Sequence, residues 1–436
     1  MQLLPRRRLP DSLGANTLKR PAHARVLAAI GLLSACGEDP GDVSRRADEP
    51  ERCDRSAACR SLGDGGVERV LALPSYVQAA PEPEDNPTTP EKVALGRLLF
   101  YERRLSSGGQ LSCASCHEQQ SAFSVPEATS LGAADEPTAR NAQSLANIAY
   151  ASYLTWSNLT FLTLEQQMFA PLFGDNPVEL GAGAVRGDDN HYSTARLEQL
   201  VQEDIGYAHA FEEAFPEADH SERTTWQHAI AAIACFERSL LSFGSPYDAY
   251  LRGEPNAFDA AQERGRQLFF SERLHCGDCH AGPLLSLAFP VGSTRPTRAE
   301  AFRNTGLYNL EHGAVAYLSG ERGRYPLPNI GIAEFSQDVA DDGKFRIPSL
   351  RNVALTAPYM HDGVFETLSE VLDHYARGGT LITDGPLSGD GRNHPAKDPL
   401  VSGFELSKSE RADLLEFLEA LSDPTFTAAP GFGPPR

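Results

Sequence analysis

The sequence has no excess of basic residues. Its 39 lysines and arginines are outnumbered by 59 aspartates and glutamates, which gives a formal net charge of -20 at pH 7. A protein that neutralises nucleic-acid phosphates needs clustered lysine and arginine, so this composition argues against nucleic-acid binding. The acidic surface either keeps the protein soluble or attracts a basic partner.

Long hydrophobic runs are also missing. The apolar run VLAAIGLLSA (26–35) is too short to cross a bilayer as a helix, and it follows several basic residues, a pattern typical of a signal peptide. It ends in LSAC (33–36), which resembles a bacterial lipobox. We therefore expect residues 1–36 to be a lipoprotein signal, Cys36 to carry a lipid anchor, and the protein to be periplasmic. The alternative is a secretory leader in which Cys36 is an ordinary residue.

Cysteine is scarce, with eight residues in 436. Cys53 and Cys59 fall within residues 37–86, a stretch rich in Pro, Gly, Ser and acidic residues that we expect to be a flexible tether. An oxidising compartment permits a disulfide between these two cysteines. Cys235 lies in a stretch with helical apolar periodicity, so we expect a buried, inert thiol there.

The other four cysteines occur in CASCH (113–117) and CGDCH (276–280). A Cys-x-x-Cys pair alone indicates zinc or redox chemistry, but a directly following histidine is the signature of covalent c-type haem attachment. A zinc site would need four ligands in one place, whereas these pairs lie far apart in the sequence. We therefore predict two covalently bound haem c groups, one held by Cys113, Cys116 and His117 and the other by Cys276, Cys279 and His280.

A longer repeat surrounds the two haem motifs. ALGRLLFYERRL (94–105) precedes the first and ERGRQLFFSERL (263–274) precedes the second, which indicates one duplicated unit. We predict a mainly α-helical protein of two cytochrome c-like haem domains, with long loops and little sheet. The expected boundaries are an N-terminal haem domain with the peroxide site over 87–255, a C-terminal haem domain over 256–425, and a tail over 426–436.

The chain resembles the bacterial di-haem cytochrome c peroxidases and their MauG relatives. The likeness is carried by NPTTPEKVALGRLLFYERRLSSGGQLSCASCH (86–117) and FRIPSLRNVALTAPYMHDGVFETLSEVLDHYARGG (345–379). It implies that His117 and His280 are the proximal iron ligands. In the peroxidases a histidine in the loop after the first haem closes that iron, but here Ala133 stands at its place and residues 118–190 contain no histidine. We expect a permanently open first haem.

The resemblance also places a glutamine and a glutamate above the open iron. TLEQQMFAPLFGDNPVEL (163–180) supplies Gln167 and Glu179, with Pro171 at the family spacing between them. The carboxylate would move a proton of the peroxide, and the amide would orient it. Two more residues separate Gln167 from Glu179 than in the peroxidases. The alternatives are a solvent-exposed loop carboxylate and a helix-face amide.

At the second haem the resemblance implies a different distal ligand from that of the peroxidases. They place a methionine fourteen residues after the histidine of a PYFHDG-type motif; here the motif is PYMHDG, with His361, and the ligand position holds Tyr375, as in MauG. A thioether raises the iron potential, whereas a phenolate stabilises high-valent iron. Alternatively, Tyr375 is a core aromatic, and Met360 or His374 binds instead.

Two further features come from the resemblance. Trp156 matches a tryptophan that relays oxidising equivalents between the haems, although a buried tryptophan is most often a core residue. Asn141, Thr356 and Pro358 match the protein ligands of a calcium ion, whose preference for oxygen donors admits backbone carbonyls.

The resemblance implies an enzyme that reacts with hydrogen peroxide at the first haem and uses a high-valent di-haem state to oxidise a partner protein. The segment PLFGDNPVEL (171–180) is similar to di-haem enzymes associated with methanobactin-type copper handling, which are described as converting a partner's tryptophan to kynurenine. One alternative is a cytochrome c peroxidase that takes electrons from a small redox protein. The other is a non-catalytic di-haem electron carrier.

Overall fold

The computed structural model describes residues 73–435 except 184, 187–190 and 293, and the described residues belong to one compact unit. The predicted signal segment, the lipidated Cys36 and the Cys53–Cys59 pair lie outside the described residues. Of the predicted tether, the residues from Leu73 on are described and pack on the compact unit. Tyr76, for example, donates its phenol hydrogen to Asp248 at 2.7 Å.

Helices dominate the structure, as the sequence predicts, and strands occur only as three antiparallel pairs of two residues each among the described residues. The helices are α3 (Pro90–Phe100), α4 (Leu164–Gln167), α5 (Phe169–Phe173), α6 (Ala195–Glu203), α7 (Ile205–Ala214), α8 (Trp226–Ser239), α9 (Pro246–Leu251), α10 (Ala260–Phe269), α11 (Cys276–Cys279), α12 (Arg298–Ala301), α13 (Ala333–Ser336), α14 (Leu368–Arg377), α15 (Lys408–Glu419) and α16 (Pro424–Ala428). The strand pairs are β1 (Val185–Arg186) with β2 (His191–Tyr192), β3 (Phe302–Arg303) with β4 (Phe345–Arg346), and β5 (Leu381–Ile382) with β6 (Gly389–Asp390).

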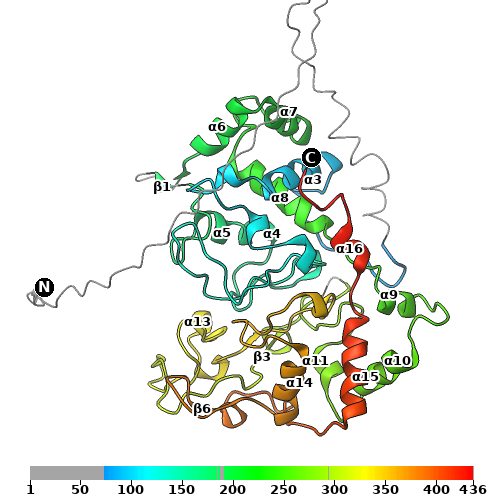
Figure 1. Cartoon of the computed structure of the whole chain (residues 1–436). Helices are drawn as coiled ribbons and strands as arrows, with labels where there is room; N and C mark the ends of the chain where they lie inside the picture. The colour runs from blue at the N-terminus through cyan, green and yellow to red at the C-terminus, as the bar shows by residue number, and fades with distance from the viewer. Residues whose placement is uncertain (1–72, 184, 187–190, 293, 436) are drawn as a thin grey trace, which may run out of the picture. The chain divides into compact units, whose positions relative to one another are not determined.

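The duplicated sequence forms two copies of one helix pair. Helix α3 packs on α8 and α10 packs on α15, and both pairs are visible in Figure 1. In each pair the glycine of the repeated Gly-Arg-x-Leu-Phe stretch touches the backbone of the second helix: a Cβ atom on Gly96 would lie 1.9 Å from the Ala232 carbonyl oxygen, and one on Gly265 would lie 1.9 Å from that of Asp413. Only a residue without a side chain allows this approach. These two matching contacts agree with the predicted duplication.

A second repeated feature is a backbone hydrogen bond at the end of the second helix of each pair. Asn147 and Asn352 both adopt left-handed backbone conformations, with φ of 57° and 62°. Their backbone N–H groups donate to the carbonyls of Leu240, just after α8, and Leu421, just after α15, at 2.8 and 3.0 Å. Asparagine tolerates this conformation better than most residues. Each copy therefore consists of a helix, a haem-motif loop, a left-handed asparagine turn and a second helix.

Three hydrophobic clusters form the core. The largest surrounds α3 and α8 and contains the ring contacts of Phe100, Phe123 and Phe236. A second surrounds α10 and α15, where Phe269 and Phe417 meet at 5.3 Å between ring centroids. The third gathers aromatic residues from the irregular segments between α12 and α14, namely Tyr308, Tyr317, Tyr325 and Phe345. The first two clusters centre on the two helix pairs of the repeat, and the first also contains later residues such as Leu284, Phe289 and Phe302.

The last residues of the chain return to the first helix pair, and we call residues 426–434 the C-terminal strap. Arg97 on α3 donates to the carbonyls of Pro430 and Gly433, both at 2.7 Å. Gln119, two residues after the first haem motif, donates to the Ala429 carbonyl at 2.8 Å. The rings of Phe426 and Phe432 belong to the cluster around α3 and α8. The core of the first unit therefore includes residues from the far end of the chain.

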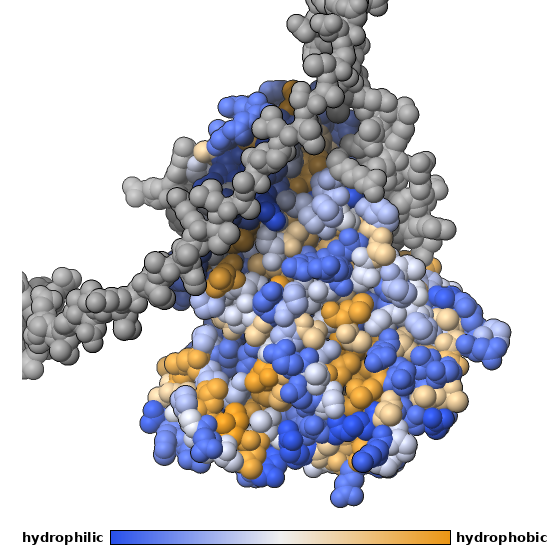
Figure 2. All heavy atoms as spheres, in the orientation of Figure 1, coloured by the Kyte–Doolittle hydropathy of each residue, from blue (hydrophilic) through white to orange (hydrophobic). Residues whose placement is uncertain are grey.

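Figure 2 shows hydrophilic and hydrophobic residues mixed over the visible face. The most exposed large apolar side chains are Leu318, at 88%, Ile205, at 70%, and Leu327, at 66%. Scattered apolar residues of this kind are normal on soluble proteins. Within the described part of the chain, no helix has the length and apolar character needed to cross a membrane.

Candidate functional site

The two motif histidines are held in the same way. The ring Nδ1 of His117 lies 2.8 Å from the Phe123 carbonyl oxygen, and that of His280 lies 2.9 Å from the Leu285 carbonyl oxygen. A carbonyl can only accept, so Nδ1 carries the hydrogen and Nε2 keeps its lone pair. Burial lowers the pKa of both rings, to about 4 for His280. Both are thus neutral imidazoles with Nε2 available to a metal, which is the arrangement of an iron ligand fixed by a hydrogen bond.

None of the four motif cysteines forms a disulfide with a cysteine that the structure describes. Burial is the main cause that raises the pKa of each thiol, to about 12 for Cys276. A high thiol pKa disfavours the thiolate that zinc binding and disulfide exchange require. Within the described residues, no group of three or more His, Cys, Asp and Glu side chains is arranged to hold a metal ion. Uncharged thioethers to a porphyrin suit these positions better than zinc does.

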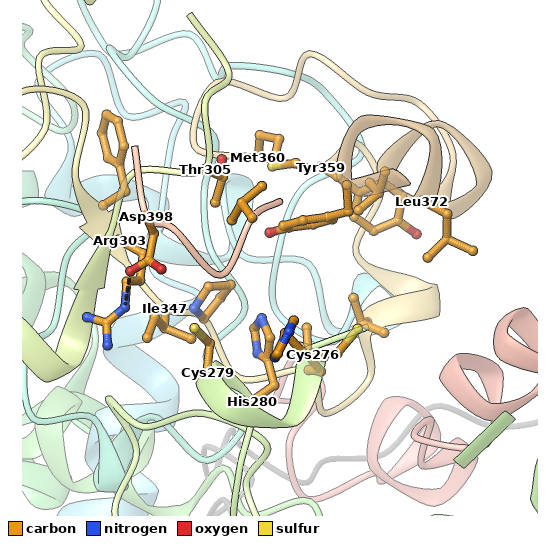
Figure 3. Close-up of a pocket in the computed structure, with 18 of the residues that line it drawn as sticks. Cys276, Cys279, His280, Arg303, Thr305, Ile347, Tyr359, Met360, Leu372 and Asp398 are labelled. Carbon is orange, nitrogen blue, oxygen red and sulfur yellow. Dashed lines mark ion pairs between the residues drawn. The ribbon is translucent and has the colours of Figure 1, made fainter. Parts of the chain in front are cut away.

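A mostly apolar pocket adjoins the second motif (Figure 3). Its cavity volume is about 210 Å³. Cys276, Cys279 and His280 lie on one wall, and Tyr359 and Met360 lie on the opposite wall (Figure 3). Two thiols and an imidazole at the edge of an apolar pocket fit a covalently bound haem.

Tyr375 lines this pocket from α14, together with Leu368, Val371 and Leu372 of the same helix. Its hydroxyl makes no hydrogen bond to any residue that the structure describes, and burial, with smaller contributions from Cys279 and Cys276, raises its pKa above the usual value. A phenolate at this position therefore needs a nearby cation, which a haem iron would supply.

The two alternative ligands differ in placement. Met360 lines the same pocket. His374 is buried outside the pocket lining, and its Nδ1 pairs with the Thr380 hydroxyl at 2.8 Å. Geometry therefore disfavours His374 and leaves Tyr375 and Met360 as candidates, of which Tyr375 matches the position implied by the resemblance.

The first site can be located by its correspondence with the second. Helices α4 and α14 both begin after a threonine whose side chain caps the helix, Thr163 and Thr367, and both continue with leucine. Counted from these caps, Gln167 corresponds to Val371 and Pro171 to Tyr375. Val371 and Tyr375 line the second pocket, and the correspondence predicts that Gln167 and Pro171 take the equivalent places at the first haem. Proline has no side-chain donor for a metal.

Glu179 lies close to Pro171 in the structure. The Leu180 N–H donates to the Pro171 carbonyl at 2.9 Å, and the Ala133 N–H donates to the Glu179 carbonyl at 2.7 Å. Burial raises the pKa of the Glu179 carboxyl, and its charge acts on the thiols of the first haem motif. The structure thus brings Glu179, Pro171 and Ala133 together near the first motif, despite the unusual spacing of Gln167 and Glu179.

Trp156 also lines the second pocket, and its indole N–H donates to the Asn141 carbonyl at 2.9 Å. The Asn141 N–H in turn donates to the His361 carbonyl at 2.9 Å, three residues beyond Pro358. Two of the predicted calcium ligands therefore lie on segments that contact each other. The third, Thr356, uses its hydroxyl to donate to the Val353 carbonyl at 3.1 Å. The calcium site stays a prediction.

The sequence of residues 90–256 matches the family model described as di-haem cytochrome c peroxidase. The chain is 35% identical to the cytochrome-c peroxidase IdrP1 of Pseudomonas sp. over 78% of its own length and 83% of that protein. The chain belongs to the di-haem cytochrome c peroxidase family. Membership makes it an oxidoreductase with haem c cofactors and hydrogen peroxide as its oxidant, and excludes the electron-carrier alternative.

Other relatives within the di-haem peroxidase family are of the MauG type. The chain is 30% identical to the methylamine utilization protein MauG of Methylorubrum extorquens, over 84% of this chain and 89% of that one. Among solved structures, a MauG-like protein associated with microbial copper homeostasis is 43% identical and superposes with a TM-score of 0.76, covering 84% of this chain and 99% of that one. The di-haem peroxidase BthA from Burkholderia thailandensis, at 21% identity and a TM-score of 0.56, shares the fold.

Sequence reasoning missed two charged residues of this di-haem peroxidase. Glu237 on α8 is buried, its carboxylate makes no hydrogen bond or ion pair with any described residue, and burial raises its pKa to about 8. Phe236 and Phe417 occupy equivalent places against Gly96 and Gly265, so Glu237 corresponds to Leu418, which lines the second pocket. The internal repeat, once aligned through the second helices, is the signal that would have found it. The other missed residue is Arg346, in β4.

Proposed function

We propose that this protein reacts with hydrogen peroxide at its first haem and withdraws electrons from an aromatic side chain of a partner protein. Tyr375 carries this proposal. It lines the second haem pocket and has no hydrogen-bond partner of its own among the described residues, so its oxygen is free to meet the iron. A hard anionic ligand favours the oxidised states of iron, whereas the methionine of an electron-accepting haem does the opposite.

The residues proposed around the first haem have different roles in the reaction with peroxide. Glu179 would take a proton from bound peroxide and return it to the departing oxygen, and burial, which raises its pKa, suits a carboxyl to this exchange. The Gln167 amide would orient the peroxide by hydrogen bonding. Pro171 would keep the distal side free of an iron ligand. The chemistry that the haem supplies when bound is cleavage of the O–O bond.

The fully ferric protein is expected to react with hydrogen peroxide without prior reduction, because neither Ala133 nor Pro171 can close the first iron. Stopped-flow spectra of the as-isolated protein mixed with one equivalent of peroxide should change without an added electron donor. EPR of the same sample should show one high-spin and one low-spin ferric signal. Two low-spin signals, with no reaction until one haem is reduced, would instead indicate a closed first haem.

For the specific activity we propose oxidation of a partner's tryptophan to kynurenine. The similarity to a MauG-like protein associated with copper homeostasis, at 43% identity, supports a partner involved in copper handling. Trp156 would pass oxidising equivalents between the two haems, since it borders the second pocket.

The partner proposal predicts a defined product. Small exported proteins encoded beside this gene would be mixed with the holoprotein and hydrogen peroxide, and their tryptic peptides analysed by mass spectrometry. Kynurenine should appear in a partner incubated with both components and be absent when either is omitted. Unmodified partners, together with rapid turnover of reduced cytochrome c, would favour the cytochrome c peroxidase alternative, which the similarity to IdrP1 supports.

Three further features complete the proposal. Export to the periplasm and lipid attachment through Cys36 rest on the sequence alone. Calcium binding by Asn141, Thr356 and Pro358 is supported by the Asn141–His361 hydrogen bond, which joins the two segments. A calcium ion at this junction would stabilise the contact between the Trp156 region and the second haem loop.

A further inference from the structure

Arg346 is a buried cation without a counter-charge. Its side chain is 2% exposed, and it forms no ion pair with any carboxylate that the structure describes. Two other buried arginines are paired: Arg238 lies 2.7 Å from Glu165, and Arg351 contacts Asp248. A buried charge left uncompensated is strongly destabilising, so the surroundings of Arg346 are incomplete without an anion.

The contacts that Arg346 does make are all with neutral groups. Its Nε donates to the Thr155 carbonyl at 3.1 Å, its Nη2 donates to the Gln143 side-chain oxygen, and its guanidinium lies 4.8 Å from the ring centre of Phe289. Its Nη1 is buried and has no partner. A guanidinium has five N–H donors in a planar fork, and the unused part of this fork suits a carboxylate.

Arg346 lines the same pocket as His280 and Tyr375. A second arginine, Arg303 on the paired strand β3, also lines this pocket, but Arg303 lies 2.8 Å from Asp398. The pocket therefore holds one neutralised and one unneutralised cation. A haem carries two carboxylates, its propionates, and these are the anionic groups that the cofactor brings into the pocket.

We propose that Arg346 binds a propionate carboxylate of the second haem through Nη1 and is the residue that couples this haem to the Trp156 segment. The coupling follows from the other contacts of Arg346. Its backbone N–H donates to the Trp156 carbonyl at 2.8 Å, and its side chain donates to the neighbouring Thr155. One residue thus contacts both the cofactor pocket and the backbone that carries the tryptophan.

The test measures the reduction potential of each haem in purified holoprotein by spectroelectrochemical titration. Arg346→Gln should lower the potential of the second haem selectively, because a cation beside the porphyrin stabilises the reduced, less positive state. Arg346→Lys keeps the charge and should restore most of the potential. The control is the double variant Arg303→Gln with Asp398→Asn, which removes a cation and an anion together and should shift the potential less.

Resonance Raman spectroscopy gives a second measurement that does not need the glutamine variant to load haem. The propionate bending band of the second haem should shift between wild type and Arg346→Lys, because the hydrogen-bond donor changes from a guanidinium to an ammonium. An unshifted band would overturn the proposal. So would a second-haem potential that is the same in Arg346→Gln as in wild type, or one that falls equally in the lysine and glutamine variants.

Discussion

Replacing Glu179 with glutamine is expected to slow the reaction with hydrogen peroxide by about 10²- to 10⁴-fold, the usual loss when a positioned proton-transfer group is removed. Haem content should not change, because the substitution leaves Cys113, Cys116 and His117 intact. Stopped-flow mixing of the ferric protein with peroxide measures the rate. Glu136→Gln is the matched control, since Glu136 is an exposed carboxylate in the adjoining loop. Equal rates in wild type and Glu179→Gln would assign the proton transfer to another group.

The Glu179→Gln variant should also differ from wild type in how the rate of the peroxide reaction depends on pH. Glu179 accepts a proton only when it is ionised, so the rate falls as the pH drops through its pKa. Burial raises that pKa, so the fall should begin above the pH of about 4.3 at which an exposed glutamate titrates. The glutamine variant should lack this limb of the profile.

Replacing Tyr375 with methionine is expected to raise the reduction potential of the second haem and abolish oxidation of the partner protein. A thioether is a soft, neutral ligand that favours reduced iron, so the variant should behave more like an electron-accepting cytochrome. Redox titration and kynurenine analysis of the partner are the measurements, and turnover of reduced cytochrome c should rise in the variant. Tyr359→Phe removes a phenol from the same pocket lining and serves as the control.

Two outcomes would contradict the role of Tyr375. If Tyr375→Met keeps the wild-type potential and the wild-type activity, the tyrosine is a packing residue and Met360, on the same pocket, becomes the candidate ligand. If Tyr359→Phe shifts the potential as much as Tyr375→Met does, the effect belongs to the polarity of the pocket and not to a ligand.

Local patterns predicted much of this structure. The haem motifs and the repeated Gly-Arg-x-Leu-Phe stretches are short patterns that can be recognised within a few residues. The repeated stretches lie in the helices over 90–100 and 260–269. The contact between Gly96 and the Ala232 carbonyl could not be predicted in the same way. It joins two helices that are far apart in the sequence, and the residues around the glycine do not indicate which helix it will contact.

In the candidate site, too, some features can be predicted from neighbouring residues and others depend on the whole fold. His117 and His280 are identified by the two cysteines before them, whereas the carbonyls that orient their rings depend on left-handed turns at Phe123 and Leu285. The missing counter-charge of Arg346 is a property of its whole surroundings, since any of the 59 acidic residues in the chain could have met it. Only the folded structure shows that none of the described ones does.

The C-terminal strap bears on how the protein is made. A ribosome delivers the N-terminal haem motif long before residues 426–434, yet the rings of Phe426 and Phe432 complete the core around the first helix pair. Until they arrive, Phe123, which meets Phe426 at 5.6 Å between ring centroids, lacks that packing partner. The first unit therefore stays incomplete while the second is being synthesised, and its exposed apolar surface is open to aggregation or chaperone binding. The packing around the first haem motif therefore depends on residues that are synthesised last.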